Sequence, residues 1–251
     1  MELQPLDRQV FLAAGTLDEG NRYASTVLVT VDEPLLGTIC SGVLLDSRVV
    51  LTAGHCVCPR RKGSEGFRID ASACVKTASV TTVTYEPAKA RHMSNARTHV
   101  YDGAVRPHPE LEILFDAQAR VVSGRADLAV ITLDSPVEGL RPDIALADSE
   151  VQLNEALVMA GYGHDPRFGG IFGARYFRQN TVTRVPTPHG GRLLFEQRGT
   201  YLYNGFPGGP CFREGESGRW LVGITSVGTD TELSLTSTYF HRDWIHAALR
   251  K

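Results

Sequence analysis

The chain has 251 residues, and its 26 Lys plus Arg against 28 Asp plus Glu give a formal net charge of -2. This near balance supplies no strongly basic surface, so we expect neither a nucleic-acid partner nor an anionic membrane partner. No apolar run approaches the ~20 residues of a membrane-spanning helix. The first eight residues lack the basic start and apolar core of a signal peptide. The length suits one large all-β domain or two small ones.

Short apolar or alternating runs bounded by turn residues recur along the chain and predict β-strands. The expected strands cover residues 25–31, 41–45, 49–51, 128–133, 157–160, 193–195, 221–226 and 236–240. Only residues 241–249 have helical spacing, with Trp244 and Ala248 on one face. The pattern therefore predicts an all-β protein that ends in a short helix.

Several motifs follow one another in a distinctive order. CSGVLL at 40–45 is followed by VVLTAGHC at 49–56, DLAVITL at 127–133, AGYG at 160–163, NGFPGGP at 204–210 and LVGITSVG at 221–228. In this order and spacing, the motifs resemble those of the trypsin/chymotrypsin family of serine proteases. The resemblance extends over about residues 25–248.

The resemblance implies two packed six-stranded antiparallel β-barrels and a short C-terminal helix. Within a single trypsin-like domain of residues 1–251, the N-terminal barrel would cover about 25–125, the C-terminal barrel about 126–240, and the helix 241–250. The 71 residues between the histidine and aspartate motifs exceed what a compact family member needs. We therefore expect enlarged surface loops between Cys58 and Arg125, including residues 90–99.

The resemblance assigns catalytic-triad roles to His55 and Asp127. In the family, the aspartate holds the imidazole in the tautomer that accepts the proton of a catalytic serine. Ser226 resembles a serine that supports this aspartate. A half-buried structural histidine and a surface aspartate at a strand start are the alternatives for His55 and Asp127.

At the place of the catalytic serine the chain has Pro207, which has no hydroxyl to attack a carbonyl. Ser217 is the competing nucleophile, but its charged neighbours indicate an exposed turn. In the family, the oxyanion site uses the N–H groups of the serine and of the first glycine in this motif. Gly205 matches that glycine, whereas proline has no N–H.

The activation switch and the substrate pocket also differ from the family pattern. Phe206 stands where the family has an aspartate that pairs with a newly cut N-terminal amine, and no IVGG-type start is clear at residues 9–15. Tyr201 replaces the acid with which trypsin-like members bind Arg or Lys, so we do not expect the pocket to bind a basic side chain of a ligand. Gly228 keeps the cleft mouth open, and Val227 replaces the usual tryptophan.

The chain contains five cysteines. The resemblance implies a disulfide between Cys40 and Cys56, and Cys58 with Cys74 is the natural second pair. Cys211 remains, either as a buried thiol that packs like a small apolar side chain or as a reactive group. Two disulfides favour a secreted or periplasmic protein, whereas the lack of a signal peptide in this chain leaves a cytoplasmic location open.

These residues together predict a protease homologue that lacks its nucleophile and acts by binding a protein or peptide in its cleft. Two alternatives stay open: an active trypsin-like serine endopeptidase, and a decoy or regulator of a related protease. No cofactor is implied. The histidines other than His55 show no spacing with cysteines or carboxylates that would indicate zinc.

Overall fold

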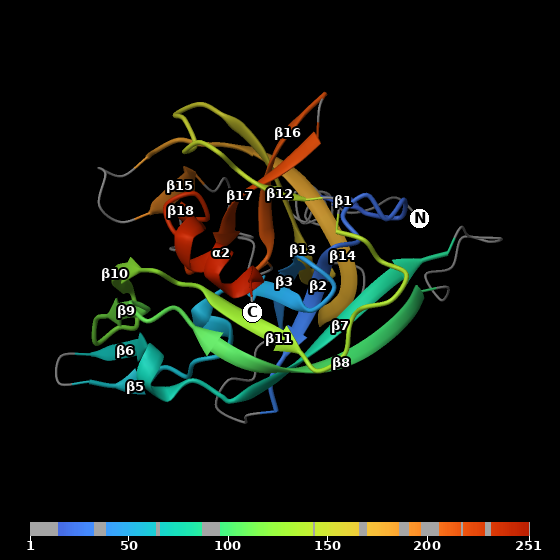
Figure 1. Cartoon of the computed structure of the whole chain (residues 1–251). Helices are drawn as coiled ribbons and strands as arrows, with labels where there is room; N and C mark the ends of the chain where they lie inside the picture. Colours follow the sequence, from blue (N-terminus) through green and yellow to red (C-terminus); the bar gives the residue numbers. More distant parts are fainter. Residues whose placement is uncertain are drawn as a thin grey trace, which may run out of the picture.

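The structure of the chain is a computed structural model (Figure 1). It describes residues 15–32, 39–63, 66–86, 96–142, 144–165, 170–185, 191–196, 206–216, 218–228 and 232–250. Over these ranges most of the chain forms β-strands, with short 3-10 helices and an α-helix near the C-terminus. The all-β class predicted from the pattern of apolar runs is confirmed.

Six antiparallel strands close into a barrel in the order β11-β4-β3-β2-β7-β8. Their bounds are β2 Thr26–Thr30, β3 Cys40–Leu44, β4 Val49–Thr52, β7 Thr77–Tyr85, β8 Ala96–Pro107 and β11 Ala129–Leu133. Every residue of β3 and β4 is buried, which explains why both read as apolar runs without alternation. The barrel extends past residue 125, where we expected it to end, because β11 pairs with both β4 and β8 and so closes it.

The region from Cys58 to Arg125 contains more regular structure than enlarged loops. It holds the long hairpin of β7 and β8, and a separate four-stranded sheet in the order β10-β9-β6-β5 (Figure 1). The strands of this sheet are β5 Arg61–Lys62, β6 Phe67–Asp70, β9 Glu112–Phe115 and β10 Val121–Arg125. Part of the loop expected at 90–99 belongs to β8, which begins at Ala96, and residues 87–95 lie outside the described ranges.

The other strands form an eight-stranded sheet in the order β1-β14-β13-β16-β17-β18-β15, with β12 pairing beside β17. Their bounds are β1 Thr16–Leu17, β12 Ala145–Leu146, β13 Ala156–Asp165, β14 Gly170–Thr181, β15 Arg192–Glu196, β16 Pro210–Gly215, β17 Gly218–Thr225 and β18 Glu232–Ser237. β15, at one end of this order, comes back into contact with β14. Together with the closed barrel, this sheet agrees with the predicted trypsin-like double-barrel fold.

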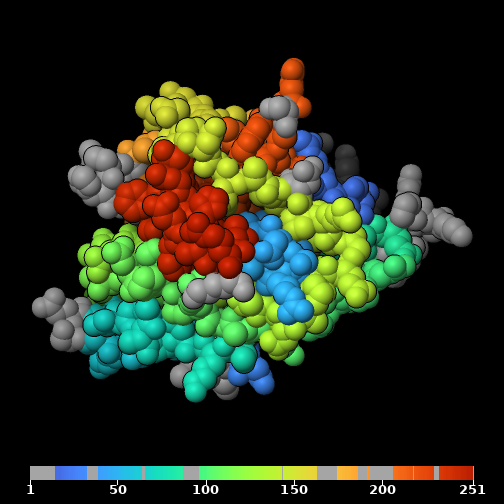
Figure 2. All heavy atoms as spheres, in the orientation of Figure 1, coloured from blue at the N-terminus to red at the C-terminus, as the bar shows by residue number. Residues whose placement is uncertain are grey.

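The C-terminal helix α2, Arg242–Leu249, packs on the first barrel although it follows the second set of strands. Ile245 and Ala248 are buried in the same apolar cluster as the barrel side chains. Trp244 packs against His108, which follows β8. Figure 2 shows the C-terminal segment (red) against segments drawn in green. Within the described residues, no helix is long and apolar enough to cross a membrane.

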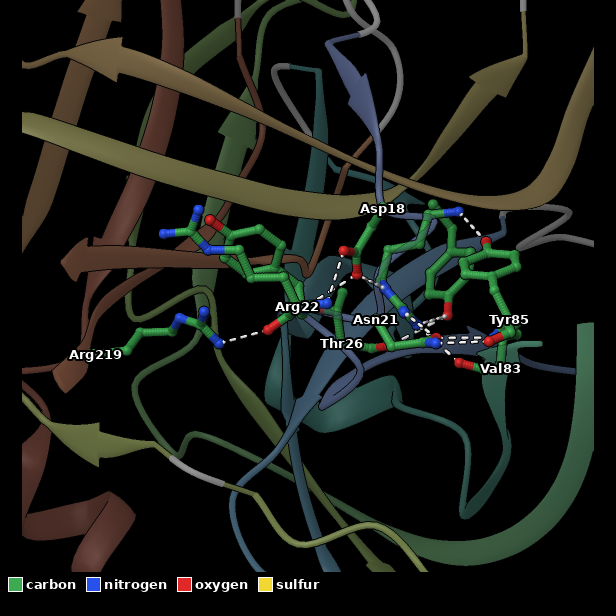
Figure 3. Close-up of polar contacts among 10 residues, drawn as sticks. Asp18, Asn21, Arg22, Thr26, Val83, Tyr85 and Arg219 are labelled. Atoms are coloured by element: carbon green, nitrogen blue, oxygen red, sulfur yellow. Dashed lines mark hydrogen bonds and ion pairs between the residues drawn. The ribbon is translucent and has the colours of Figure 1, made fainter. Parts of the chain in front are cut away.

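A buried polar cluster centred on Arg175 of β14 links the two sets of strands (Figure 3). The Arg175 guanidinium donates to the carboxylate of Asp18 at 2.7 Å and to the backbone carbonyl of Val83 in β7 at 2.8 Å. It also donates to the hydroxyl of Tyr162 in β13 at 3.1 Å and to the side-chain oxygen of Asn21 at 3.2 Å. One side chain thus holds both sets of strands and the segment that precedes β2.

Candidate functional site

His55 and Asp127 lie at facing ends of two paired strands. His55 is in the 3-10 turn Gly54–Cys56, just after β4, and Asp127 lies just before β11. The two strands run antiparallel with Thr52 opposite Ala129, so the end of one lies beside the start of the other. The register therefore brings together two side chains that are 72 positions apart in sequence.

The Asp127 carboxylate accepts three hydrogen bonds. His55 donates from Nδ1 to Oδ2 at 2.7 Å and from its backbone N–H to Oδ1 at 2.8 Å, and the Ser226 hydroxyl donates to Oδ2 at 2.5 Å. Asp127 is buried, so the alternative of a surface aspartate is excluded. Burial opposes ionisation, but the charge interaction with His55 and the hydrogen bonds hold the pKa of Asp127 below its ordinary value. An ionised carboxylate only accepts, so Nδ1 of His55 is the donor in this contact.

The cysteines around His55 form the expected pairs. Cys40 is bonded to Cys56 and Cys58 to Cys74, and Nε2 of His55 lies 3.8 Å from Sγ of Cys56. Cys40, His55 and Cys56 are close enough together to suggest a metal site, but both sulfurs are committed to the disulfide and are not thiolate ligands. Cys211 is a buried free thiol whose pKa is raised by burial, which favours its packing role over a reactive one.

Pro207 lies between the strands that carry His55 and the segment that carries Ser226. The Ser41 amide donates to the Pro207 carbonyl at 2.7 Å, and Ser41 adjoins Cys40, the disulfide partner of Cys56 next to His55. On the other side, the Gly208 amide donates to the carbonyl of Thr225, the residue before Ser226, at 2.8 Å. These two hydrogen bonds fix the segment that contains Pro207 against both halves of the site.

Residues 206–209 have the features of a type II β-turn. The Gly209 amide donates to the Phe206 carbonyl at 2.7 Å, and Gly208 has a φ of 77°. Such a turn favours proline at its second position and glycine at its third, which are Pro207 and Gly208. A Cβ on Gly208 would lie 2.2 Å from the Ser41 carbonyl oxygen, so only glycine fits there.

Phe206 is buried within the second set of strands. Its side chain is 1% exposed and belongs to an apolar cluster with Leu157, Met159 and Val222. The ring lies so close to Gly161 that a Cβ there would be 2.5 Å from it. Gly161 lies inside β13, and the place expected for an activating aspartate is filled by an apolar ring.

The two residues after Ser226 form the solvent-accessible edge of the site. Val227 is half-buried and Gly228 is exposed. A Cβ on Gly228 would lie 2.6 Å from the Glu232 carbonyl oxygen, so a substitution there would also disturb β18. The predicted pocket residue Tyr201, the predicted oxyanion glycine Gly205 and the competing Ser217 lie outside the described residues, so their roles stay predictions.

Sequence reasoning missed Arg192, the first residue of β15. Its guanidinium Nη2 donates to the Val227 carbonyl at 3.3 Å. Burial lowers the pKa of Arg192, while the nearby carboxylates of Asp127 and Glu232 act in the opposite direction. A single arginine after two glycines carries no motif, so only the folded arrangement reveals its place at the site.

The comparisons with known proteins agree with this geometry. The family described as a trypsin-like peptidase domain matches residues 40–224, well over half of the chain and including His55, Asp127 and Pro207. The chain therefore belongs to the trypsin-like peptidase family. No curated protein matches its sequence.

Proposed function

We propose that this member of the trypsin-like family is a non-catalytic homologue that binds a protein or peptide ligand in its cleft. The single observation that carries the proposal is Pro207. Its carbonyl accepts a hydrogen bond from the amide of Ser41, which adjoins the Cys40–Cys56 disulfide next to His55. The following amide, of Gly208, donates to the carbonyl of Thr225, the residue before Ser226. At this position the motif of the family carries its nucleophile, and proline has no side-chain group that can be deprotonated.

The backbone of Pro207 adds a second argument. Proline has no N–H to donate to an oxyanion, and the loss of one such donor costs about 10²–10³ in rate even where the nucleophile is present. In the family the imidazole accepts the proton of the nucleophile, and Pro207 has neither an O–H nor an N–H to supply one. Val227 is half-buried and Gly228 is exposed directly after Ser226, and this access to the site supports a role in ligand binding.

An active serine endopeptidase is the second candidate, and a specific observation favours it. The contacts among His55, Asp127 and Ser226 have the geometry that a working triad uses to orient its imidazole. A different serine would then have to approach His55, and Ser217 is the candidate from the sequence.

A decoy or regulator that competes for a related protease's inhibitor or substrate would use the same binding cleft. The two disulfides favour an oxidising compartment for either function.

Labelling with a fluorophosphonate probe tests the absence of catalysis. We expect no labelling of the wild-type chain under conditions in which an ordinary trypsin-like protease is fully labelled. A probe adduct located by peptide mass spectrometry at any serine would overturn the proposal, and an adduct at Ser217 would identify the alternative nucleophile.

An array of synthetic octapeptides tests the binding role. We expect a subset of the peptides to bind the wild-type chain and Val227→Glu to abolish that binding. The matched control is Val122→Glu, because Val122 is 66% exposed on β10, in the separate four-stranded sheet. If no peptide binds, or if the two variants behave alike, the cleft is not the binding surface.

A further inference from the structure

We infer that Arg192 forms a cationic subsite at the cleft edge and selects ligands with an acidic side chain. The inference rests on the proposed function, because it names the chemistry of the peptide that the cleft would hold. It concerns a residue outside the triad and outside the predicted pocket.

The strand pairing brings Arg192 close to the segment of Ser226 and Val227. Arg192 pairs with Thr236 of β18, and two positions earlier in β18 the Ser234 carbonyl accepts the amide of Ser226 at 2.8 Å. The Arg192 side chain extends along this strand edge far enough for Nη2 to reach the Val227 carbonyl. Its guanidinium therefore lies beside the two residues that form the accessible edge, Val227 and Gly228.

The positive charge of Arg192 has no dedicated carboxylate among the described residues. Asp127, which interacts with it electrostatically, is buried and already accepts hydrogen bonds from His55 and Ser226. Glu232 accepts from Arg184 at 2.8 Å with each of its two oxygens. A guanidinium carries several N–H donors in a fixed fork, and the contact with Val227 uses only one of them.

A carboxylate is the ligand group that fits the remaining donors. Arginine and carboxylate form paired, charge-assisted hydrogen bonds that add geometric specificity. Arg192 is half-buried, so a charge partner would be screened less than at an open surface. A lysine or arginine side chain at the same place would be repelled, so the cleft distinguishes acidic from basic peptides.

The test uses octapeptides in matched groups of three, whose members differ only in having Glu, Gln or Lys at one position. For wild-type protein, we expect Glu peptides to bind at least about tenfold more tightly than their Gln counterparts at one position, the size of one charge-assisted hydrogen bond. Arg192→Gln should remove this preference while Gln peptides still bind, and Arg192→Glu should favour Lys. Arg192→Lys, which keeps the charge, should retain a reduced preference.

Arg97→Gln is the matched control, because Arg97 of β8 also loses its charge in this variant but forms an exposed ion pair with Glu86, which leaves the partners of Arg192 unchanged. We expect its peptide preference to equal that of wild-type protein. If peptides bind without a Glu preference, or if Arg192→Gln keeps that preference, the inference is wrong and the binding function stands. If no peptide binds to wild-type protein, both the inference and the proposed function fail.

Discussion

Asp18 and Arg175 form an ion pair whose side chains are 1% and 0% exposed. Nε of Arg175 donates to Oδ2 of Asp18 at 2.7 Å, and the same carboxylate accepts the backbone amides of Arg22 and Tyr23 at 2.8 and 2.9 Å (Figure 3). Burying two charges costs several kcal/mol per ion unless hydrogen bonds satisfy the remaining donors and acceptors. Here the neighbouring backbone supplies those partners, so the pair fixes the segment before β2 to the second set of strands.

Breaking this pair from one side should destabilise the protein strongly. We expect Arg175→Met to lower the free energy of unfolding by about 3–5 kcal/mol, because Asp18 would be left as an uncompensated buried charge. Arg184→Met removes an exposed pair and should cost at most about 1 kcal/mol. Urea unfolding followed by fluorescence measures both. A loss for Arg175→Met no larger than that for Arg184→Met would contradict the account.

The sequence predicts the elements of the site that local motifs specify. The resemblance to the family motifs identifies His55 in TAGHC, Asp127 just before β11 and Ser226 just after β17. Arg175 is a different case. It lies between Ala174 and Tyr176 in a strand, where a single charged residue between apolar ones is the pattern of an outward-facing side chain, and its partner Asp18 is 157 positions away. Nothing in the local pattern therefore distinguishes it from a solvent-exposed arginine.

Strand pairing explains the other differences between prediction and structure. The interval between His55 and Asp127 looked like enlarged loops, but β7 and β8 pair along nearly their whole length. Many of the β8 side chains are exposed, so its residues show no buried-strand pattern. Pairing between distant strands stabilises such segments, and a single sequence does not display it.

The effect of His55 on ligand binding separates the two candidate functions. We expect His55→Ala to bind octapeptides within about twofold of wild-type protein, because a binding cleft does not need a proton acceptor. Its stability should fall by about 1–3 kcal/mol, since the buried Asp127 carboxylate loses a hydrogen-bond donor. Binding is measured by fluorescence anisotropy at matched protein concentration. A folded His55→Ala protein that has lost its biological activity would favour catalysis instead.

Restoring a serine should not restore an enzyme. We expect Pro207→Ser to leave the hydrolysis of a panel of peptide esters and amides near background. The segment is fixed by Phe206 in the apolar cluster and by the close contact of Gly208 with Ser41, and a misplacement of ~1 Å can cost ~10²-fold. Pro207→Ala is the matched control without a hydroxyl. Turnover by Pro207→Ser near that of ordinary proteases would show that the segment already has catalytic geometry.

Stability should fall in acid because of two buried histidines. The rings of His108 and His241 lie 4.7 Å apart, and burial together with His108 lowers the pKa of His241 from 6.5 to about 4. The unfolded chain therefore binds the proton more tightly. The contribution of His241 to stability is complete above about pH 6.5 and is lost as the pH falls to about 4, on the order of 3 kcal/mol in total.

Paired variants isolate this contribution. His241→Phe should flatten the dependence of the unfolding free energy on pH between about 6.5 and about 4. His246→Gln, at an exposed position of the same helix, should leave the dependence unchanged. Urea unfolding at several pH values provides the comparison, and equal slopes for wild-type protein and His241→Phe would rule out the role of His241.

The turn at residues 206–209 makes replacement of Pro207 costly for stability. Proline and glycine at its two central positions match the backbone that the turn requires, and a compatible proline typically adds about 0.4–1 kcal/mol by restricting the unfolded chain. Pro207→Ser would give up this stability, and Phe206 would still fill the place where the family has its activating carboxylate. If this variant shows no hydrolysis, as predicted above, the substitution lowers stability and gains no activity. Selection for stability alone would therefore keep proline at position 207.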